Sequence, residues 1–241
     1  MTTQSTVKKG KFLYEGKAKK FYEAQEADLG IFEYTDRATA FNAKKVGQIH
    51  DKGAVNNQVS AKLFSVLEGK GIPTHFVKLL SDREMLVRRV EIIPLEVTIR
   101  NRVAGGMARQ FGIEEGRRLK QPVYELHYKS DPLDDPLMNE DHALGLGLAT
   151  EPELKTIREL SFQVNAALQE FFKARQLELI DFKLEFGRHK GQVLLADEIS
   201  PDTMRLWQFG TEEKMDKDRF RRDLGKVEDA YQTVLTRVLN D

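Results

Sequence analysis

The stretch LIDFKLEFGRHKGQVLLADEISPDTMRLW, residues 179–207, carries the pattern from which we predict the fold and the site. In its first half, Asp181, Lys183 and Glu185 alternate with apolar side chains. A period of two is typical of a β-strand with one apolar face and one ionic face. A second strand is predicted over residues 192–199. We therefore expect two antiparallel strands that carry charged side chains on one side.

The turn between these strands fixes how their residues face one another. Lys190-Gly191 suits a two-residue turn, because glycine tolerates the positive φ that such turns require. In this register Glu185 lies opposite Ala196 and beside Asp197. Two neighbouring carboxylates without a compensating pair are costly unless a cation lies between them, and their oxygens suit Mg²⁺. The pattern leaves open the alternative of an exposed sheet edge with solvated charges.

Composition narrows the class of protein. The 241 residues include 38 basic and 38 acidic side chains and no cysteine. A net charge of zero argues against an overall preference for nucleic acid or for an anionic membrane, and the lack of cysteine excludes disulfides and thiolate metal sites. No stretch reaches the roughly 18 to 20 apolar residues of a membrane span, and residues 1–11 lack the apolar segment of a signal peptide. We expect a cytoplasmic protein whose anion-binding sites are local.

The segment LYEGKAKKFYE, residues 13–23, is predicted to form two short strands joined across Gly16. Lys17 and Lys19 project from that turn on one side. A glycine beside lysines lets the backbone approach phosphates closely while the ammonium groups supply charge. The alternative is that these lysines keep an exposed edge strand soluble.

The segment PLEVTIRNRVAGG, residues 94–106, is a second candidate for phosphate binding. Strand alternation puts Arg100 on a polar face, and Gly105-Gly106 begins a short helix with free backbone N–H groups. Helix N-termini and guanidinium groups both favour phosphate, so this segment predicts a phosphate clamp. An ordinary surface ion pair between Arg100 and Glu96 is the alternative.

Other segments give expectations about the scaffold. Residues 36–52 show no clear period and are predicted to form an ordered polar loop, and residues 131–142 an acidic loop. An amphipathic helix is predicted over residues 56–68. The clearest helix starts with Thr150 as its N-cap and Glu153 at the capping-box position.

Three long segments, taken together, resemble the signature stretches of the SAICAR synthetase family, the phosphoribosylaminoimidazole-succinocarboxamide synthases. They are LIDFKLEFG at residues 179–187, IIPLEVTIRNRVAGG at residues 92–106 and LADEISPDTMRLW at residues 195–207. Shorter matches extend the resemblance over nearly the whole chain; they are EGKAKK, KGAVNNQVS, DPLMNE and MDKDRFR.

The resemblance implies an α+β fold. A small antiparallel-sheet lobe over residues 1–91 would cover the nucleotide, and a larger ATP-grasp-like lobe over residues 92–241 would hold the other substrates and the metal. The implied activity is an ATP-dependent ligase that joins L-aspartate to CAIR and releases SAICAR, ADP and phosphate in purine biosynthesis. The CAIR carboxylate would first accept the γ-phosphoryl group of ATP, and the aspartate amine would then displace phosphate. Mg²⁺ as cofactor and a homodimer are implied as well.

Matching the family's motifs residue by residue assigns roles within this chain. Catalytic roles fall on four residues, of which the last two also hold the metal: Asp181, Lys183, Glu185 and Asp197. ATP binding falls on Lys17, Lys19, Arg88, Val90 and Glu91. CAIR binding falls on Arg100, Gly105, Gly106, Asp202 and Arg205. Candidates for aspartate binding are Thr39, Asn42 and Lys129.

Some positions depart from the pattern that the resemblance implies. Gly106 stands where the family usually has serine, and Thr39 and Asn42 stand where serine and aspartate are usual. These departures remove a hydroxyl donor and alter the charge of one loop. Two rival functions remain open: a related ligase or small-molecule kinase, and a nucleotide-binding regulatory module without turnover. The retained carboxylate pair argues against the regulatory module, which does not need both metal ligands.

Overall fold

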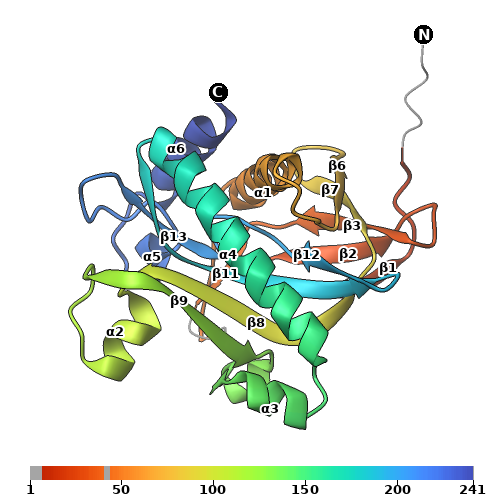
Figure 1. The fold of residues 1–241 in the computed structure, drawn as a ribbon. Helices are drawn as coiled ribbons and strands as arrows, with labels where there is room; N and C mark the ends of the chain where they lie inside the picture. Colours follow the sequence, from red (N-terminus) through yellow and green to blue (C-terminus); the bar gives the residue numbers. More distant parts are fainter. Residues whose placement is uncertain (1–6, 41–43, 241) are drawn as a thin grey trace.

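Two antiparallel β-sheets with helices packed against them make up the protein (Figure 1). The computed structural model describes residues 7–40 and 44–240. The first sheet has the strand order β1 (Phe12–Glu15), β2 (Lys19–Glu23), β3 (Leu29–Tyr34), β7 (Glu84–Arg88) and β6 (Phe76–Leu79). The second has the order β10 (Leu137–Met138), β9 (Arg118–Tyr128), β8 (Glu91–Arg102), β11 (Leu177–His189) and β12 (Gln192–Ala196), with β13 (Met204–Gln208) also paired to β11.

The remaining elements connect and cover these sheets. A separate hairpin is formed by β4 (Arg37–Ala40) and β5 (Lys45–Gln48). The helices are α1 (Lys52–Gly69), α2 (Gly105–Phe111), η1 (Asp131–Leu133), α3 (Glu140–Gly145), α4 (Glu151–Ala174), α5 (Asp218–Arg221) and α6 (Val227–Leu239). In the described part of the chain, no helix is long and apolar enough to cross a membrane.

The predicted strand pair is confirmed as β11 and β12. Their turn has positive φ at both Lys190 (49°) and Gly191 (81°), and Glu185 lies opposite Ala196. The second strand ends at Ala196, earlier than predicted, because Asp197 adopts a left-handed φ of 62°. Such a conformation costs a non-glycine residue on the order of 1 kcal/mol or more, and surrounding contacts must hold it in place.

The polar loop predicted over residues 36–52 is wrong, because this segment forms β4, β5 and the first residue of α1. Strand β4 shows no alternation, since Ala38, Thr39 and Ala40 are all buried. Helix α1 starts four residues before the predicted helix, because Lys52 is buried although its type suggests a surface position. The acidic loop predicted over residues 131–142 is also interrupted, by η1, β10 and the start of α3.

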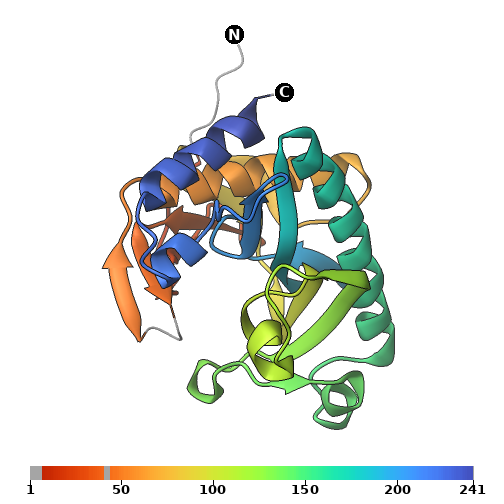
Figure 2. The same cartoon turned by 90° about the vertical axis from the view of Figure 1, so that its left-hand side faces the viewer.

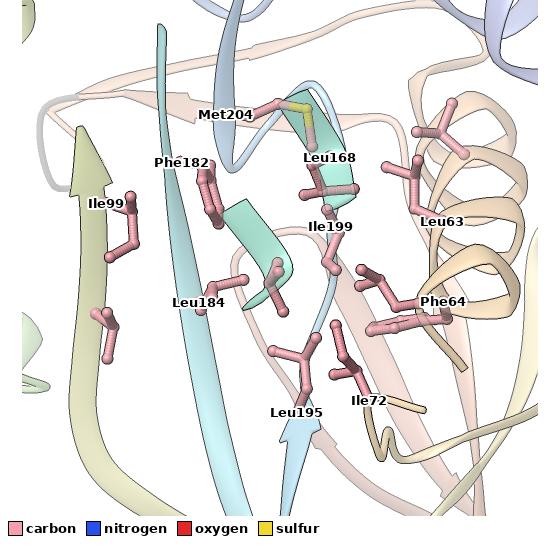
Figure 3. Close-up of a cluster of buried hydrophobic side chains, with 14 of the residues drawn as sticks. Leu63, Phe64, Ile72, Ile99, Leu168, Phe182, Leu184, Leu195, Ile199 and Met204 are labelled. Atoms are coloured by element: carbon pink, nitrogen blue, oxygen red, sulfur yellow. The ribbon is translucent and has the colours of Figure 1, made fainter. Parts of the chain in front are cut away.

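One apolar core connects the two sheets. Helix α4 packs against β11 and β8, and α1 packs against β3 and β6. Figure 3 shows Leu63 and Phe64 of α1 pointing toward the same space as Phe182 and Leu184 of β11. Figure 2 shows α4 running along the second sheet on the side opposite the β4–β5 hairpin. The ionic face of β11 is thereby left free to line a site.

The predicted start of helix α4 is confirmed in detail. The Thr150 hydroxyl accepts the N–H of Glu153 at 3.4 Å, and the Glu153 carboxylate accepts the N–H of Thr150 at 2.8 Å. This reciprocal pair satisfies N–H groups that have no partner within the helix. Glu153 also binds Arg188 of β11, so the helix cap is attached to the sheet that carries the ionic face.

Candidate active site

The charged residues predicted from alternation meet at the centre of the second sheet. β8 pairs with β11 so that Arg100 lies opposite Asp181. β13 pairs with the other edge of β11 and puts Arg205 opposite Asp181 as well. Because every second side chain lies on one face, Lys183 and Glu185 continue the same row. Residues that are about a hundred positions apart in sequence therefore form one polar surface.

Two adjoining cavities open on this surface. The hairpin cavity, of about 310 Å³, lies beneath the β1–β2 hairpin, and its polar lining includes Lys19, Lys129, Glu185, Asp197 and Glu198. The arginine cavity, of about 290 Å³, lies toward β13, and its lining includes Thr98, Arg100, Asp181, Arg205 and Arg221. The residues that line both are Lys17, Thr39, Glu96, Lys183, Asp202, Thr203 and Lys217. A ligand in one cavity would lie directly beside a ligand in the other.

Lys19 is the buried cation of the hairpin cavity. Its Nζ lies 2.8 Å from Asp197 Oδ1 and 3.0 Å from Glu198 Oε1, and it also lies over the rings of Phe32 and Tyr34. Burial disfavours the ammonium ion, but the two carboxylates outweigh burial and hold the pKa of Lys19 well above its usual value. Lys19 is therefore a fixed positive charge at neutral pH.

Glu185 and Asp197, the predicted metal ligands, each have a lysine partner. Lys129 Nζ lies 2.7 Å from Glu185 Oε1, and Lys19 binds Asp197. Burial and the Asp197 carboxylate raise the pKa of Glu185. Burial would also raise the pKa of Asp197, but Lys19 outweighs it and the pKa is lowered. The expectation of uncompensated carboxylates is thus wrong, because the compensating lysines come from β2 and from the residue that follows β9.

The carboxylate pair nevertheless suits a hard divalent cation. Within residues 7–40 and 44–240, no group of three or more histidine, aspartate and glutamate side chains could hold a metal by itself. Mg²⁺ is usually held by one or two carboxylates together with substrate phosphates and water. Burial and, after it, repulsion from Asp197 raise the pKa of Glu185, and a bound cation would relieve the repulsion. The donor set therefore fits Mg²⁺ that binds together with a nucleotide.

Lys183 stands on the wall that both cavities share. Its Nζ lies 2.7 Å from Glu96 Oε2 of β8. Burial opposes its charge, but Glu96 and Glu185 outweigh burial and raise the pKa of Lys183. Lys183 therefore presents a permanent positive charge to ligands on either side.

Arg100 and Arg205 share one carboxylate in the arginine cavity. Arg100 Nη1 lies 2.7 Å from Asp181 Oδ2, and Arg205 Nη1 lies 2.9 Å from the same oxygen. Glu125 of β9 binds Arg100 Nε at 2.9 Å, and Asp218 of α5 binds Arg205 Nε at 2.8 Å. The alternative of an ordinary surface ion pair is wrong, because Arg100 is only 7% exposed. Both guanidinium groups are held rigidly at the cavity wall.

The Gly105-Gly106 turn packs against these arginines. At Gly105, with φ of 55°, a Cβ atom would lie 2.4 Å from Arg205 Nη2, so a larger residue would displace the guanidinium group. At Gly106 a Cβ atom would lie 3.9 Å from Arg100 Nη2, so the serine usual in the family would have room. The N–H of Gly105 donates to Glu115 Oε1 at 3.4 Å, so the expectation that this N–H is free for phosphate is wrong.

The groups that hold Asp202 are not predicted from the sequence. Lys52 and Lys217 place their Nζ atoms 3.0 and 3.1 Å from Asp202 Oδ2, and the Tyr231 hydroxyl donates to Oδ1 at 2.7 Å. Burial opposes ionisation of Asp202, but Lys217 and Lys52 outweigh it and lower the pKa. The two lysines lie in KGAVNNQVS and MDKDRFR, segments that carried the resemblance without an assigned role. Tyr231 gave no signal of its own.

The remaining predicted residues fall into three groups. Those that line the hairpin cavity are Thr39, Arg88, Val90 and Lys129. Glu91 has its carboxylate 3.0 Å from Arg188 and does not belong to the lining of either cavity. Asn42 lies outside the described residues.

Fold and site together define a class of enzyme. The protein is a mixed helix and sheet structure that places two ligand cavities side by side among lysines, arginines and paired carboxylates. Fixed charges of this kind neutralise and align phosphorylated substrates, and they stabilise charge that moves between them. The class is therefore that of enzymes that bind two phosphorylated ligands side by side.

Comparisons with known proteins identify the family within this class. The family model described as SAICAR synthetase matches residues 12–238. The phosphoribosylaminoimidazole-succinocarboxamide synthase of Desulfitobacterium hafniense (strain Y51) is 56% identical over 232 residues, which are 96% of this chain and 98% of that protein.

Solved structures agree with the sequence comparison. The crystal structure of phosphoribosylaminoimidazole-succinocarboxamide synthase from Ehrlichia chaffeensis has a TM-score of 0.92 and 44% identity, and the match covers 95% of this chain and 98% of that one. A SAICAR synthetase in complex with ADP has a TM-score of 0.92 and 41% identity, over 96% and 98% of the two chains. The chain belongs to the SAICAR synthetase family. The predicted family, α+β fold and ligase class are confirmed, while the likeness of one lobe to ATP-grasp enzymes stays a prediction.

Proposed function

We propose that this chain joins L-aspartate to CAIR with consumption of ATP, and releases SAICAR, ADP and phosphate in purine biosynthesis. Membership of the SAICAR synthetase family supports this reaction. The ADP complex of a relative that is 41% identical supports ATP as the nucleotide. The observation that carries the proposal is the shared wall of the two cavities, because phosphoryl transfer requires donor and acceptor to be adjacent.

ATP occupies the hairpin cavity and CAIR the arginine cavity. The ATP-binding set is Lys17, Lys19, Arg88, Val90 and Glu91, and the CAIR-binding set is Arg100, Gly105, Gly106, Asp202 and Arg205. The guanidinium groups of the arginine cavity suit charge-assisted hydrogen bonds to the ribose phosphate of CAIR, while Asp181, Glu125 and Asp218 hold them in place. The ammonium groups of the hairpin cavity suit the polyphosphate of ATP, which needs charge more than a fixed geometry.

The chemistry then proceeds in two steps. A carboxylate oxygen of CAIR attacks the γ-phosphorus of ATP, the bond from that phosphorus to the bridging oxygen breaks, and ADP leaves. The aspartate amine attacks the activated acyl carbon, phosphate leaves with the electron pair of the broken C–O bond, and the amine loses a proton as the amide forms. Lys183 stabilises the negative charge that crosses the shared wall. Asp181 contributes by fixing both arginines.

Glu185 and Asp197 would hold Mg²⁺ together with the phosphates of ATP. The cation would neutralise charge on those phosphates during transfer. Lys129, whose side chain is 41% exposed, could turn from Glu185 toward the phosphates, whereas Lys19 is buried and would stay beside Asp197.

The aspartate site is proposed near Thr39, Asn42 and Lys129. Thr39 lines both cavities and Lys129 lines the hairpin cavity, which supports a position beside the shared wall. We also propose two lobes, residues 1–91 and 92–241. In support, β7 is the last strand of the first sheet along the chain, and β8, which follows it, is the first strand of the second sheet. A homodimer in the cytoplasm completes the proposal.

The test is sustained ADP release by the purified chain with ATP and Mg²⁺, measured with CAIR and L-aspartate each supplied or omitted. We expect sustained ADP release when both cosubstrates are present. We expect this release to stop when either cosubstrate is left out. Turnover of ATP that depends on neither cosubstrate would contradict the proposal and would indicate a kinase or an ATPase.

A further inference from the structure

Asp202 lies where the two cavities meet, and three donors hold its carboxylate. Lys217 approaches from the cavities, whose shared wall it lines. Lys52 of α1 and Tyr231 of α6 approach from the protein interior, and both are 0% exposed. The two helices are in contact with each other behind the site. Asp202 is thus the link between the core and a cationic group that faces the substrates.

The hydrogen bonds around Asp202 are directional. The Tyr231 hydroxyl donates to Oδ1 at 2.7 Å, while Lys52 and Lys217 both donate to Oδ2. Of the three bonds, the one from the Tyr231 hydroxyl is the shortest, and hydrogen bonds to an ionised carboxylate are stronger than those between neutral groups. With both oxygens engaged, the carboxylate has one orientation, and the Nζ of Lys217 has a fixed acceptor 3.1 Å away.

The segment that carries Asp202 is held by the same helix. The Ser60 hydroxyl of α1 donates to the carbonyl of Ile199 and accepts the N–H of the same residue. The Ser200 hydroxyl accepts the N–H of Asp202 and donates to Glu198, which binds Lys19 in the hairpin cavity. This continuous set of bonds spans both cavities. A change at the Tyr231 hydroxyl would therefore be transmitted to the shared wall through Asp202.

We propose that Tyr231 is a positioning residue of the ligase, which holds Asp202 and, through it, the ammonium group of Lys217 at the wall shared by the two cavities. The inference rests on the proposed function, because that wall is where the phosphoryl group passes. Two lysines share the Asp202 carboxylate, and Lys217 is the one of the two that lines the cavities. A fixed cation at that place stabilises the transferred charge without reorganising during the reaction.

The test begins with Tyr231→Phe, which removes one oxygen and keeps the ring in the core. We expect kcat to fall about tenfold while the KM for ATP stays within twofold, because the lost bond aligns a group used during transfer. Tyr124→Phe is the matched control: the Tyr124 hydroxyl is buried, and it has no hydrogen-bond partner among the described residues. That control is expected to leave kcat unchanged.

A double-mutant cycle separates positioning from a purely structural role. If Tyr231 acts through Lys217, Tyr231→Phe will have little further effect on kcat in a Lys217→Met background. If the two losses multiply, or if Tyr231→Phe leaves kcat unchanged, the inference is overturned. Lys52→Met replaces Tyr231→Phe in the same cycle if the phenylalanine variant does not fold. The unmodified chain, assayed in parallel for dependence on CAIR and aspartate, shows separately whether the proposed function fails.

Discussion

The carboxylates of the hairpin cavity are arranged differently from those of the arginine cavity. Glu185 and Asp197 repel one another and are balanced by Lys19 of β2 and by Lys129, which follows β9. In the arginine cavity, by contrast, Asp181 lies between Arg100 and Arg205 and binds both. In the hairpin cavity two carboxylates repel one another, and a bound cation would relieve that repulsion. In the arginine cavity the opposite charges are already paired.

This difference indicates a division of labour between flexible and rigid charges. An ammonium group carries three donors on a flexible stem and can follow a phosphate or give way to a metal ion. A guanidinium group held by carboxylates offers planar, bidentate hydrogen bonds in one fixed direction. We infer that the hairpin cavity adjusts to its ligand on binding, whereas the arginine cavity is already in its binding geometry.

Removing one charge from the repelling pair should have the largest effect. We expect Asp197→Asn to lower kcat by about a thousandfold or more, because the amide cannot replace the anionic ligand of the metal. The measurement is ADP release dependent on CAIR and aspartate over a range of Mg²⁺ concentrations. Asp28→Asn is the control, since Asp28 pairs with Lys190 on the exposed surface. Equal Mg²⁺ dependence in the two variants would contradict the metal site.

Removing an arginine from the cluster of Asp181, Arg100 and Arg205 should instead weaken the binding of one substrate, CAIR. We expect Arg205→Ala to raise the KM for CAIR by about a hundredfold and the KM for ATP by less than threefold, because a buried charge contact of this kind is worth a few kcal/mol. Arg100→Ala should behave in the same way. Arg102→Ala is the control, because this neighbouring arginine of β8 binds Glu178 outside both cavities. Equal increases in both KM values would argue against the CAIR site.

The two cavities also differ in how much of them could be predicted from the sequence. Alternation predicts Asp181, Lys183 and Glu185, because successive side chains of a strand point to opposite faces. The Lys190-Gly191 turn fixes which residue lies opposite Ala196. The lysines that balance the hairpin cavity were not recognised as partners. Lys19 reaches Asp197 from β2, and Lys129 reaches Glu185 from just beyond the end of β9. No local pattern encodes which strands become neighbours.

The residues behind the site were the hardest to predict. Lys52 sits in a helix whose start was placed too late, because a buried lysine looks like a surface residue in sequence. Tyr231 lies on the apolar face of α6, where a tyrosine is ordinarily a core residue. Strand β4 was read as a loop because both of its faces are covered. In each case tertiary packing, rather than the local sequence, determined the outcome.

Asp216, which lies behind the arginine cavity, should make the stability of the protein depend on pH. Asp216 accepts the N–H of Leu206 at 2.8 Å and the N–H of Asp218 at 2.7 Å, and so holds the residue that binds Arg205. Burial and the Asp218 carboxylate raise the pKa of Asp216 to about 7. Between about pH 4 and pH 7 the folded protein therefore keeps a proton on Asp216 that the unfolded chain has lost. The stability that this proton contributes is fully present below about pH 4 and is lost as the pH rises through about 7.

We expect the free energy of unfolding to fall by about 2 kcal/mol between pH 5 and pH 7, since one pKa unit corresponds to about 1.4 kcal/mol. Urea unfolding of the unmodified chain and of Asp216→Asn across this range measures the effect. The asparagine variant should show a flatter dependence, because its amide does not titrate. Asp229→Asn, at an exposed position of α6, should retain the original slope. The same slope in Asp216→Asn would show that other groups cause the dependence.

The smallest expected effects come from two adjacent glycines, which test how rigid the arginine cavity is. Gly105→Ala places a Cβ atom against the Arg205 guanidinium at a positive φ, so we expect the KM for CAIR to rise about tenfold. Gly106→Ser adds a hydroxyl donor where there is room beside Arg100, so we expect the KM for CAIR to fall about twofold. Gly112→Ala separates strain from displacement, because Gly112 also has a positive φ but no atom lies within 4 Å of its Cβ position. If Gly112→Ala raised the KM for CAIR as much as Gly105→Ala, backbone strain in α2 would explain the effect, and the contact with Arg205 would not.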